Sequence, residues 1–112
     1  MLKSYVAGPY RAPTERQLLE NIHQARLCAE RLWQLGYAVF CPHLNSAHMG
    51  GVAPDEAFLN GGMEWLECAD IIVMLPTWER SAGARAERQF ALQRGIRVAT
   101  LEELEQEEDG NA

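Results

Sequence analysis

A continuous apolar segment near the middle of the chain limits the folds that this sequence can adopt. The segment DIIVML, residues 70–75, places five apolar residues in a row directly before Pro76. A central strand of a parallel sheet is buried on both faces and shows this unbroken pattern, whereas a strand with one face in water alternates. The segment therefore predicts the central strand of a parallel sheet.

The patterns on either side of this segment extend the prediction to the whole chain. Further strands are expected at residues 3–7, 37–41 and 96–100, and helices at 14–35, 56–68 and 81–94. Alternating strands and helices are typical of α/β folds, in which the crossovers are right-handed. We expect one domain with a doubly wound, flavodoxin- or Rossmann-like parallel sheet of about four strands, in the order 2-1-3-4, with helices on both faces.

Capping and breaking signals mark the ends of these elements. Thr14 and Asp55 are expected to cap the first and second helices, and Gly36 to end the first. The pair Gly61-Gly62 leaves open whether residues 56–68 form one helix or two short ones. A polar, glycine-rich loop is expected from His43 to Pro54.

Negative charge is concentrated in the last part of the chain. Six acidic residues after position 101 account for the formal net charge of −6, because the rest holds ten acids and ten bases. Residues 101–112 are therefore predicted as an acidic helix or tail, solvated or frayed, behind a domain of residues 1–100. Without a basic stripe, a nucleic acid polymer is not an expected partner.

The remaining composition indicates a cytoplasmic protein. No apolar run approaches the ~20 residues of a membrane-spanning helix, and the N-terminal residues lack a signal-peptide pattern. The three cysteines have no C-x-x-C spacing and are expected to be reduced, mostly buried thiols.

Ligands of open parallel sheets bind beyond the carboxyl ends of the strands, which selects the loops at residues 8–11, 41–45 and 76–83. In the third loop, Ser81 is the predicted helix cap, and the free N–H groups behind it form an anion site. Helical side chains lean toward the N-terminus, so Glu87 is expected above a notch at Gly83 that a small ligand could enter. Alternatively, Glu87 forms a salt bridge, for example with Arg11, and Gly83 only eases helix packing.

Other candidate binding residues also allow two interpretations each. Arg11 suits a phosphate or a carboxylate, and Tyr10 either stacks on a base or wedges its loop. Trp78 is either a lid over a base or loop packing, and His43 is a hydrogen-bonding group at the rim or an inert surface residue. The segment GPYRAP is not a G-x-G-x-x-G fingerprint. Since His43 and His48 lack a third ligand, neither a metal nor a cofactor is predicted.

Three segments together resemble a known superfamily. YVAGPYR (residues 5–11), CPH (41–43) and above all CADIIVMLPTWERSAGARAE (68–87) are similar to the nucleoside 2-deoxyribosyltransferase-like superfamily, especially its small bacterial and phage members of uncharacterised function. The resemblance extends to about residue 100. Its specific feature is the combination of G-P-Y-R with the later W-x-x-S-x-G-x-x-x-E.

The resemblance implies an enzyme that cleaves or transfers at the N-glycosidic bond of a nucleoside or a nucleoside 5′-monophosphate. Glu87 would attack the anomeric carbon of the sugar, and we expect the nearby helix N-terminus to keep it ionised. Members of the superfamily are dimers or larger, which implies a homodimer or larger homo-oligomer here. The residues implied in holding sugar and phosphate are Gly8, Pro9, Tyr10, Arg11, Ser81 and Gly83.

One position departs from the superfamily pattern. Relatives of the monophosphate hydrolase type carry an Asp eight residues before the Asp that opens the third strand, and counting back from Asp70 gives Gly62. Glycosidic cleavage with two carboxylates needs a general acid beside the nucleophile. Glu64, Asp55 or Glu56 could supply it, or the leaving base needs little help. Otherwise the chain is a catalytically silent nucleotide-binding or sensing module, or an interaction protein with a vestigial pocket.

Overall fold

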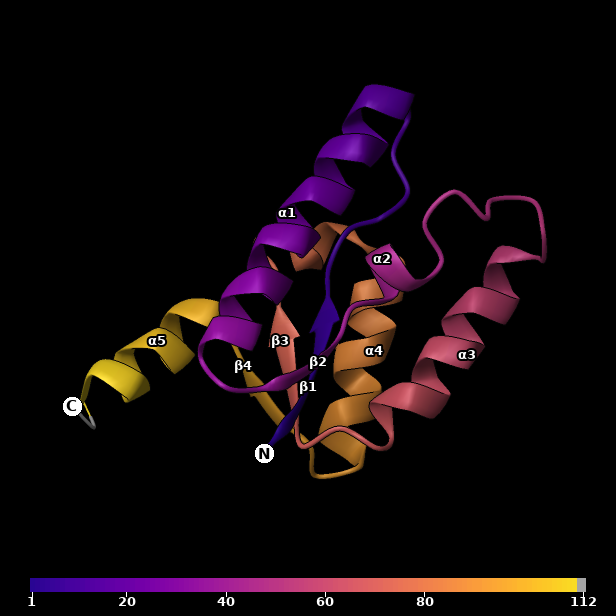
Figure 1. The fold of residues 1–112 in the computed structure, drawn as a ribbon. Coiled ribbons are helices and arrows are strands. Elements are labelled where there is room, and N and C mark those ends of the chain that lie inside the picture. Colours follow the sequence, from indigo (N-terminus) through magenta and orange to yellow (C-terminus); the bar gives the residue numbers. More distant parts are fainter. Residues whose placement is uncertain (111–112) are drawn as a thin grey trace.

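A parallel sheet forms the centre of the computed structural model, which describes residues 1–110 (Figure 1). Its four strands lie in the order β2-β1-β3-β4, and each neighbouring pair is parallel. They are β1 (Lys3–Ala7), β2 (Ala38–Phe40), β3 (Ile71–Met74) and β4 (Arg97–Ala99). The predicted α/β class and the order 2-1-3-4 are confirmed. Because the connections diverge between β1 and β3, the crevice that receives ligands in such sheets lies beyond these two strands.

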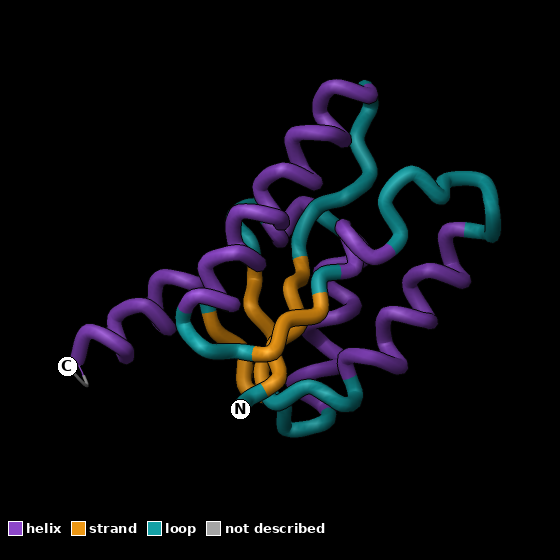
Figure 2. Tube along the Cα trace, viewed as in Figure 1, coloured by secondary structure: helices purple, strands orange, loops and turns teal. Residues whose placement is uncertain are grey.

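Helices cover both faces of the sheet, as predicted (Figures 1 and 2). One face is covered by α1 and α5, and the other by α3 and α4. None of the helices within residues 1–110 has the length and apolarity needed to cross a membrane. The bounds are α1 (Glu15–Gln34), α2 (Pro42–Asn45), α3 (Asp55–Leu66), the 3-10 helix η1 (Trp78–Arg80), α4 (Ala82–Gln93) and α5 (Leu101–Gly110).

The apolar run of β3 supplies both layers of the core. Ile71 and Val73 pack in the cluster under α1 and α5, whereas Ile72 and Met74 pack in the cluster under α3 and α4. All four side chains are buried. Successive residues of a strand point to opposite faces, so a strand covered on both sides needs an apolar residue at every position.

The boundaries of the elements confirm one expectation, decide one open alternative and correct two expectations. Thr14 caps α1 as predicted, since its hydroxyl oxygen accepts the Gln17 N–H at 3.1 Å. The predicted cap at Asp55 is wrong by one position, because Pro54 is the cap and Asp55 begins α3. The glycine pair does not split α3, and Gly62 packs closely against Tyr5 of β1. The expected loop from residue 43 begins with the short helix α2, whose first residue is a proline.

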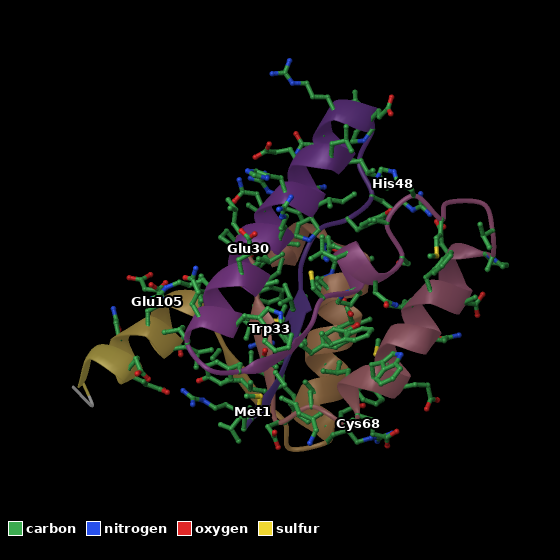
Figure 3. All side chains as sticks on the ribbon, viewed as in Figure 1. Met1, Glu30, Trp33, His48, Cys68 and Glu105 are labelled. Atoms are coloured by element: carbon green, nitrogen blue, oxygen red, sulfur yellow. The ribbon has the colours of Figure 1, made fainter. Side chains whose placement is uncertain are left out.

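The acidic C-terminal segment is a docked helix over its described part. Leu104 of α5 is 2% exposed and belongs to the core cluster under α1. Glu105 lies beside α1 and pairs with Arg31 at 3.2 Å (Figure 3), while Glu107 pairs with Arg97. The predicted acidic helix is confirmed up to Gly110, and Leu104 anchors it to the domain, so the frayed alternative is wrong there; residues 111–112 lie outside the described part. The acids gather on the outer face because the leucines need the inner one.

Candidate active site

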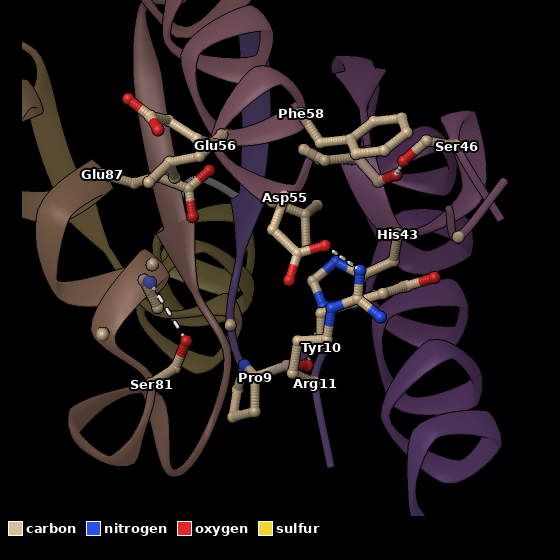
Figure 4. A pocket seen from close by; sticks show the side chains of 18 of the residues that line it. Pro9, Tyr10, Arg11, His43, Ser46, Asp55, Glu56, Phe58, Ser81 and Glu87 are labelled. Carbon is tan, nitrogen blue, oxygen red and sulfur yellow. Dashed lines mark hydrogen bonds and ion pairs between the residues drawn. The ribbon is translucent and has the colours of Figure 1, made fainter. Parts of the chain in front are cut away.

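A cavity of about 540 Å³ opens beyond the carboxyl ends of β1 and β3 (Figure 4). The β1–α1 loop, α2, the first turns of α3 and the N-terminal half of α4 form its walls. The structure brings together every candidate catalytic or substrate-binding residue except Trp78. The candidates that line the cavity are Gly8, Pro9, Tyr10, Arg11, His43, Ser81, Gly83 and Glu87.

Glu87 is a buried carboxyl group at the edge of this cavity. Its residue is 8% exposed, and its Oε2 accepts a hydrogen bond from the hydroxyl of Tyr5. Burial raises the pKa of Glu87 to about 7, although the Tyr5 hydrogen bond acts in the opposite direction. A pKa of about 7 leaves Glu87 only partly ionised near neutral pH, so burial outweighs the expected effect of the helix N-terminus, which weakens beyond the first turn of α4. The suggested salt bridge to Arg11 is also wrong, since Arg11 pairs elsewhere.

Tyr5 is the partner of Glu87 that the sequence analysis missed. It lies in β1, is 1% exposed, and points with Ala7 toward the layer of α3 and α4. Burial, followed by the proximity of Glu87, raises the pKa of Tyr5 far above its ordinary value, so the phenol keeps its proton and acts as the donor. The sequence showed that successive side chains of β1 point to opposite faces of the sheet. It did not show which helix covers each face.

Ser81 and Gly83 shape the N-terminal end of α4. Ser81 is the cap, as predicted, because its Oγ accepts the Ala84 N–H at 3.1 Å. A Cβ built on Gly83 would lie 3.8 Å from Leu59 and 3.9 Å from the Ser81 Oγ, which are ordinary contact distances. Helix packing therefore does not require glycine here. The missing side chain leaves the wall of the cavity open one turn before Glu87, where we expected the notch.

The first loop is fixed by contacts to its backbone. Gly8 is needed for packing, because a Cβ there would lie 2.6 Å from the side chain of Leu75. The Pro9 carbonyl oxygen is 2.8 Å from Nε2 of His43, and the Tyr10 carbonyl accepts from the Asn21 side chain at 3.1 Å. A carbonyl can only accept, so His43 is protonated at Nε2.

His43 is a support of the first loop. Its residue is 4% exposed, so the interpretation as an inert surface residue is wrong. His43 is a hydrogen-bonding group that lines the cavity, but its Nε2 bonds to the protein backbone. Burial lowers the pKa of His43, and the ring is therefore neutral near pH 7. The rings of His43 and Tyr10 meet in a T-shaped arrangement, with 5.6 Å between their centroids. Tyr10 is thereby wedged against the loop while it still lines the cavity.

Two arginines bring positive charge to the cavity. Arg11 forms an ion pair with Asp55 of α3, and its guanidinium carbon is 5.5 Å from the centroid of the Tyr10 ring. Arg80 of η1 also lines the cavity and was missed in the sequence analysis. The sequence feature that could have identified Arg80 was its position in the loop between β3 and Ser81.

Two other candidates lie outside the cavity. Trp78 borders a separate hollow of about 460 Å³ between α1 and the start of α5, and its ring lies 4.8 Å from the guanidinium carbon of Arg88. This placement favours loop packing over a lid. His48 lies in the loop that follows α2 (Figure 3). Among residues 1–108, whose side chains the structure describes, no group of three His, Cys, Asp or Glu side chains could hold a metal ion.

A single protein family model covers both the parallel sheet and the cavity. A family model described as a domain of unknown function (DUF4406) matches residues 2–100. The chain belongs to the DUF4406 family. The matched region runs from β1 to β4, so the DUF4406 domain contains every residue of the cavity, and α5 follows it. No curated protein matches the sequence significantly.

Position 62 of this DUF4406 domain lies against the Tyr5–Glu87 pair. A Cβ built on Gly62 would be 2.6 Å from the Tyr5 hydroxyl oxygen and 3.9 Å from Oε2 of Glu87. Of the acids suggested as substitutes for a carboxyl group here, Asp55 and Glu56 line the cavity and Glu64 does not.

Proposed function

We propose that the protein cleaves or transfers at the N-glycosidic bond of a nucleoside or nucleoside 5′-monophosphate, with Glu87 as the nucleophile. The buried Glu87 carboxyl group, held by Tyr5 at the edge of a cavity open at Gly83, carries this proposal. Tyr5 engages Oε2, and among residues 1–108, whose side chains are described, Oε1 has no hydrogen-bond partner, so it would be the attacking oxygen. The resemblance of the S-x-G-x-x-x-E segment to the nucleoside 2-deoxyribosyltransferase-like superfamily supports the same role.

The reaction would follow the course of a retaining glycosidase. Oε1 of ionised Glu87 forms a bond to the anomeric carbon, the carbon–nitrogen bond breaks, and the electron pair leaves with the base, which takes up a proton. Water then attacks the anomeric carbon of the glycosyl ester and releases the free sugar together with the Glu87 carboxylate. In transfer, a nitrogen of a second base attacks this carbon in place of water. Asp55 and Glu56 are the cavity carboxyl groups that could protonate the leaving base.

The cavity also suits the rest of such a substrate. Its volume of about 540 Å³ lies in the range of about 300–1,000 Å³ that is typical of small-molecule sites. The capped N-terminus of α4 and the side chains of Arg11 and Arg80 would receive a 5′-phosphate. We further propose a cytoplasmic homodimer or larger homo-oligomer. The three free cysteines suit that location, and sedimentation equilibrium tests the assembly.

One observation favours a second candidate function. Tyr5, whose pKa is raised, stands in the space where monophosphate hydrolases of the superfamily would carry a general acid. A phenol that holds its proton so firmly is a poor general acid. The alternative is therefore a nucleotide-binding or sensing module that keeps the cavity without turnover.

Incubation with a panel of nucleosides and nucleoside 5′-monophosphates tests the proposal, with free base detected by chromatography. Base release supports the enzyme, and adding a second free base separates transfer from hydrolysis. A ligand-induced rise in melting temperature without base release supports the binding module instead. If no member of the panel is cleaved or stabilises the protein, both functions are wrong.

A further inference from the structure

At the mouth of the cavity, Arg11 is engaged by a carboxylate of the protein itself. Asp55 is the first residue of α3, and its Oδ1 forms the ion pair with the Arg11 guanidinium (Figure 4). Both residues line the cavity, and their side chains are 55% and 70% exposed. The pair joins two segments that are 44 positions apart in the sequence.

The backbone around Arg11 is fixed, while its side chain can reorient. The preceding residues, Pro9 and Tyr10, are held through their carbonyl groups by His43 and Asn21. The Arg11 side chain, in contrast, is exposed to solvent. The guanidinium can therefore exchange Asp55 for another anion without moving the loop.

The strength of the pair permits such an exchange. An exposed ion pair is weak, because water screens the charges and two long side chains lose freedom. A phosphate can engage the guanidinium fork through two oxygens and carries more negative charge than a carboxylate. A phosphorylated sugar in the cavity would displace Asp55, and the released carboxylate would then repel the phosphate beside it.

We propose that Asp55 is a specificity-determining residue, whose carboxylate competes for Arg11 and lowers the preference of the cavity for phosphorylated over unphosphorylated sugars. This inference rests on the proposed function for the sugar and phosphate that it places in the cavity. Glu56 provides a matched control. It is the next residue, lines the same cavity and carries the same charge, but the ion pair of Arg11 within residues 1–110 is formed with Asp55.

Ribose 5-phosphate and ribose are suitable probes, because neither requires knowledge of the base. We expect Asp55→Asn to tighten ribose 5-phosphate binding about two- to fivefold, the range of a lost exposed ion pair, in titrations followed by ligand-observed NMR. Glu56→Gln should give a clearly smaller gain, and Asp55→Asn should change the affinity for ribose less than the affinity for ribose 5-phosphate. In the Arg11→Ala background, Asp55→Asn should increase the affinity for ribose 5-phosphate by no more than Glu56→Gln does.

Three outcomes would overturn the inference: equal gains from Asp55→Asn and Glu56→Gln, weaker binding after Asp55→Asn, or no ribose 5-phosphate binding by any variant. Melting curves check folding, which exposed substitutions should preserve. Failure of the proposed function is a separate result. If base is released but Asp55→Asn and Glu56→Gln increase the affinity for ribose 5-phosphate equally, only the role of Asp55 is wrong. If the affinities change as expected but no base is released, only the glycosidic chemistry is wrong.

Discussion

The hydroxyl oxygen of Tyr5 occupies the space that a side chain on Gly62 would need. A Cβ at position 62 would approach this oxygen to 2.6 Å, and Tyr5 is 1% exposed, so its ring could move aside only by displacing the packed side chains around it. The close contact of β1 with α3 therefore depends on a glycine opposite a tyrosine. The same contact places the phenol next to Glu87.

Gly62→Ala should therefore destabilise the protein by about 1–3 kcal/mol through overpacking, although alanine favours a helix over glycine by about 1 kcal/mol. With Tyr5→Phe as the background the oxygen is gone, and the nearest ring carbon lies 3.8 Å away, an ordinary contact. There Gly62→Ala should be neutral or stabilising. Urea unfolding of the four proteins measures the difference, and an equal loss in both backgrounds would contradict the proposed clash.

Tyr5→Phe should move the pH dependence of base release toward higher pH. The attacking form of Glu87 is ionised, so activity should rise as the pH passes its pKa of about 7. The Tyr5 hydrogen bond lowers this pKa, and its loss should raise the pKa further. The profile of kcat/KM against pH gives the midpoint of the rise. Tyr10→Phe, which removes another phenol of the cavity, should leave that midpoint in place, and an unmoved midpoint for Tyr5→Phe would disprove the coupling.

Glu87 should also make stability depend on pH. Its pKa rises from 4.5 to about 7 on folding, so the folded protein binds the proton more tightly. The resulting stabilisation is complete below pH 4.5 and is lost as the pH rises through 7. Relative to Glu87→Gln, the wild type should lose up to about 3 kcal/mol across this interval. Urea unfolding of both proteins at pH 5 and pH 8 measures the change, and a constant difference would show that Glu87 is solvated.

Gly83→Leu should abolish ligand binding without harming the fold. The Cβ meets only ordinary contacts, and the rest of the side chain would extend from the wall of the cavity. Leucine also favours a helix over glycine by roughly 0.8 kcal/mol, so the melting temperature should stay equal or rise. Gly83→Ala is the control, because a methyl group fits and should retain binding. Thermal melting with and without a nucleoside 5′-monophosphate reports both quantities, and unchanged affinity in Gly83→Leu would place the ligand elsewhere.

Local patterns in the sequence predicted the order of elements and much of the cavity. The apolar run of residues 70–75 predicts a doubly covered strand, and Ser81 is recognisable as a cap because its bond to Ala84 spans three residues. The loops that line the cavity follow from the rule on carboxyl ends of parallel strands. These features depend on neighbours in the chain or on a general property of the fold.

Contacts between distant segments were not predictable in the same way. The Tyr5–Glu87 bond spans 82 positions, and it depends on which face of β1 meets α4. The partner of Arg11 depends on how the first turn of α3 reaches the first loop. His43 is buried because the short helix α2 turns it inward, where a loop was expected. The raised pKa of Glu87 is a consequence of this tertiary burial.

The role of Glu87 as the nucleophile is tested most directly by trapping the glycosyl ester. Wild type and Glu87→Gln are incubated with the nucleosides and monophosphates of the panel, quenched in acid and mapped by peptide mass spectrometry. We expect base release by the wild type and, on the peptide that contains Glu87, a mass gain equal to the sugar or sugar phosphate less one water, with neither in Glu87→Gln. Undiminished base release by Glu87→Gln, or a sugar attached to another residue, would contradict the proposed chemistry.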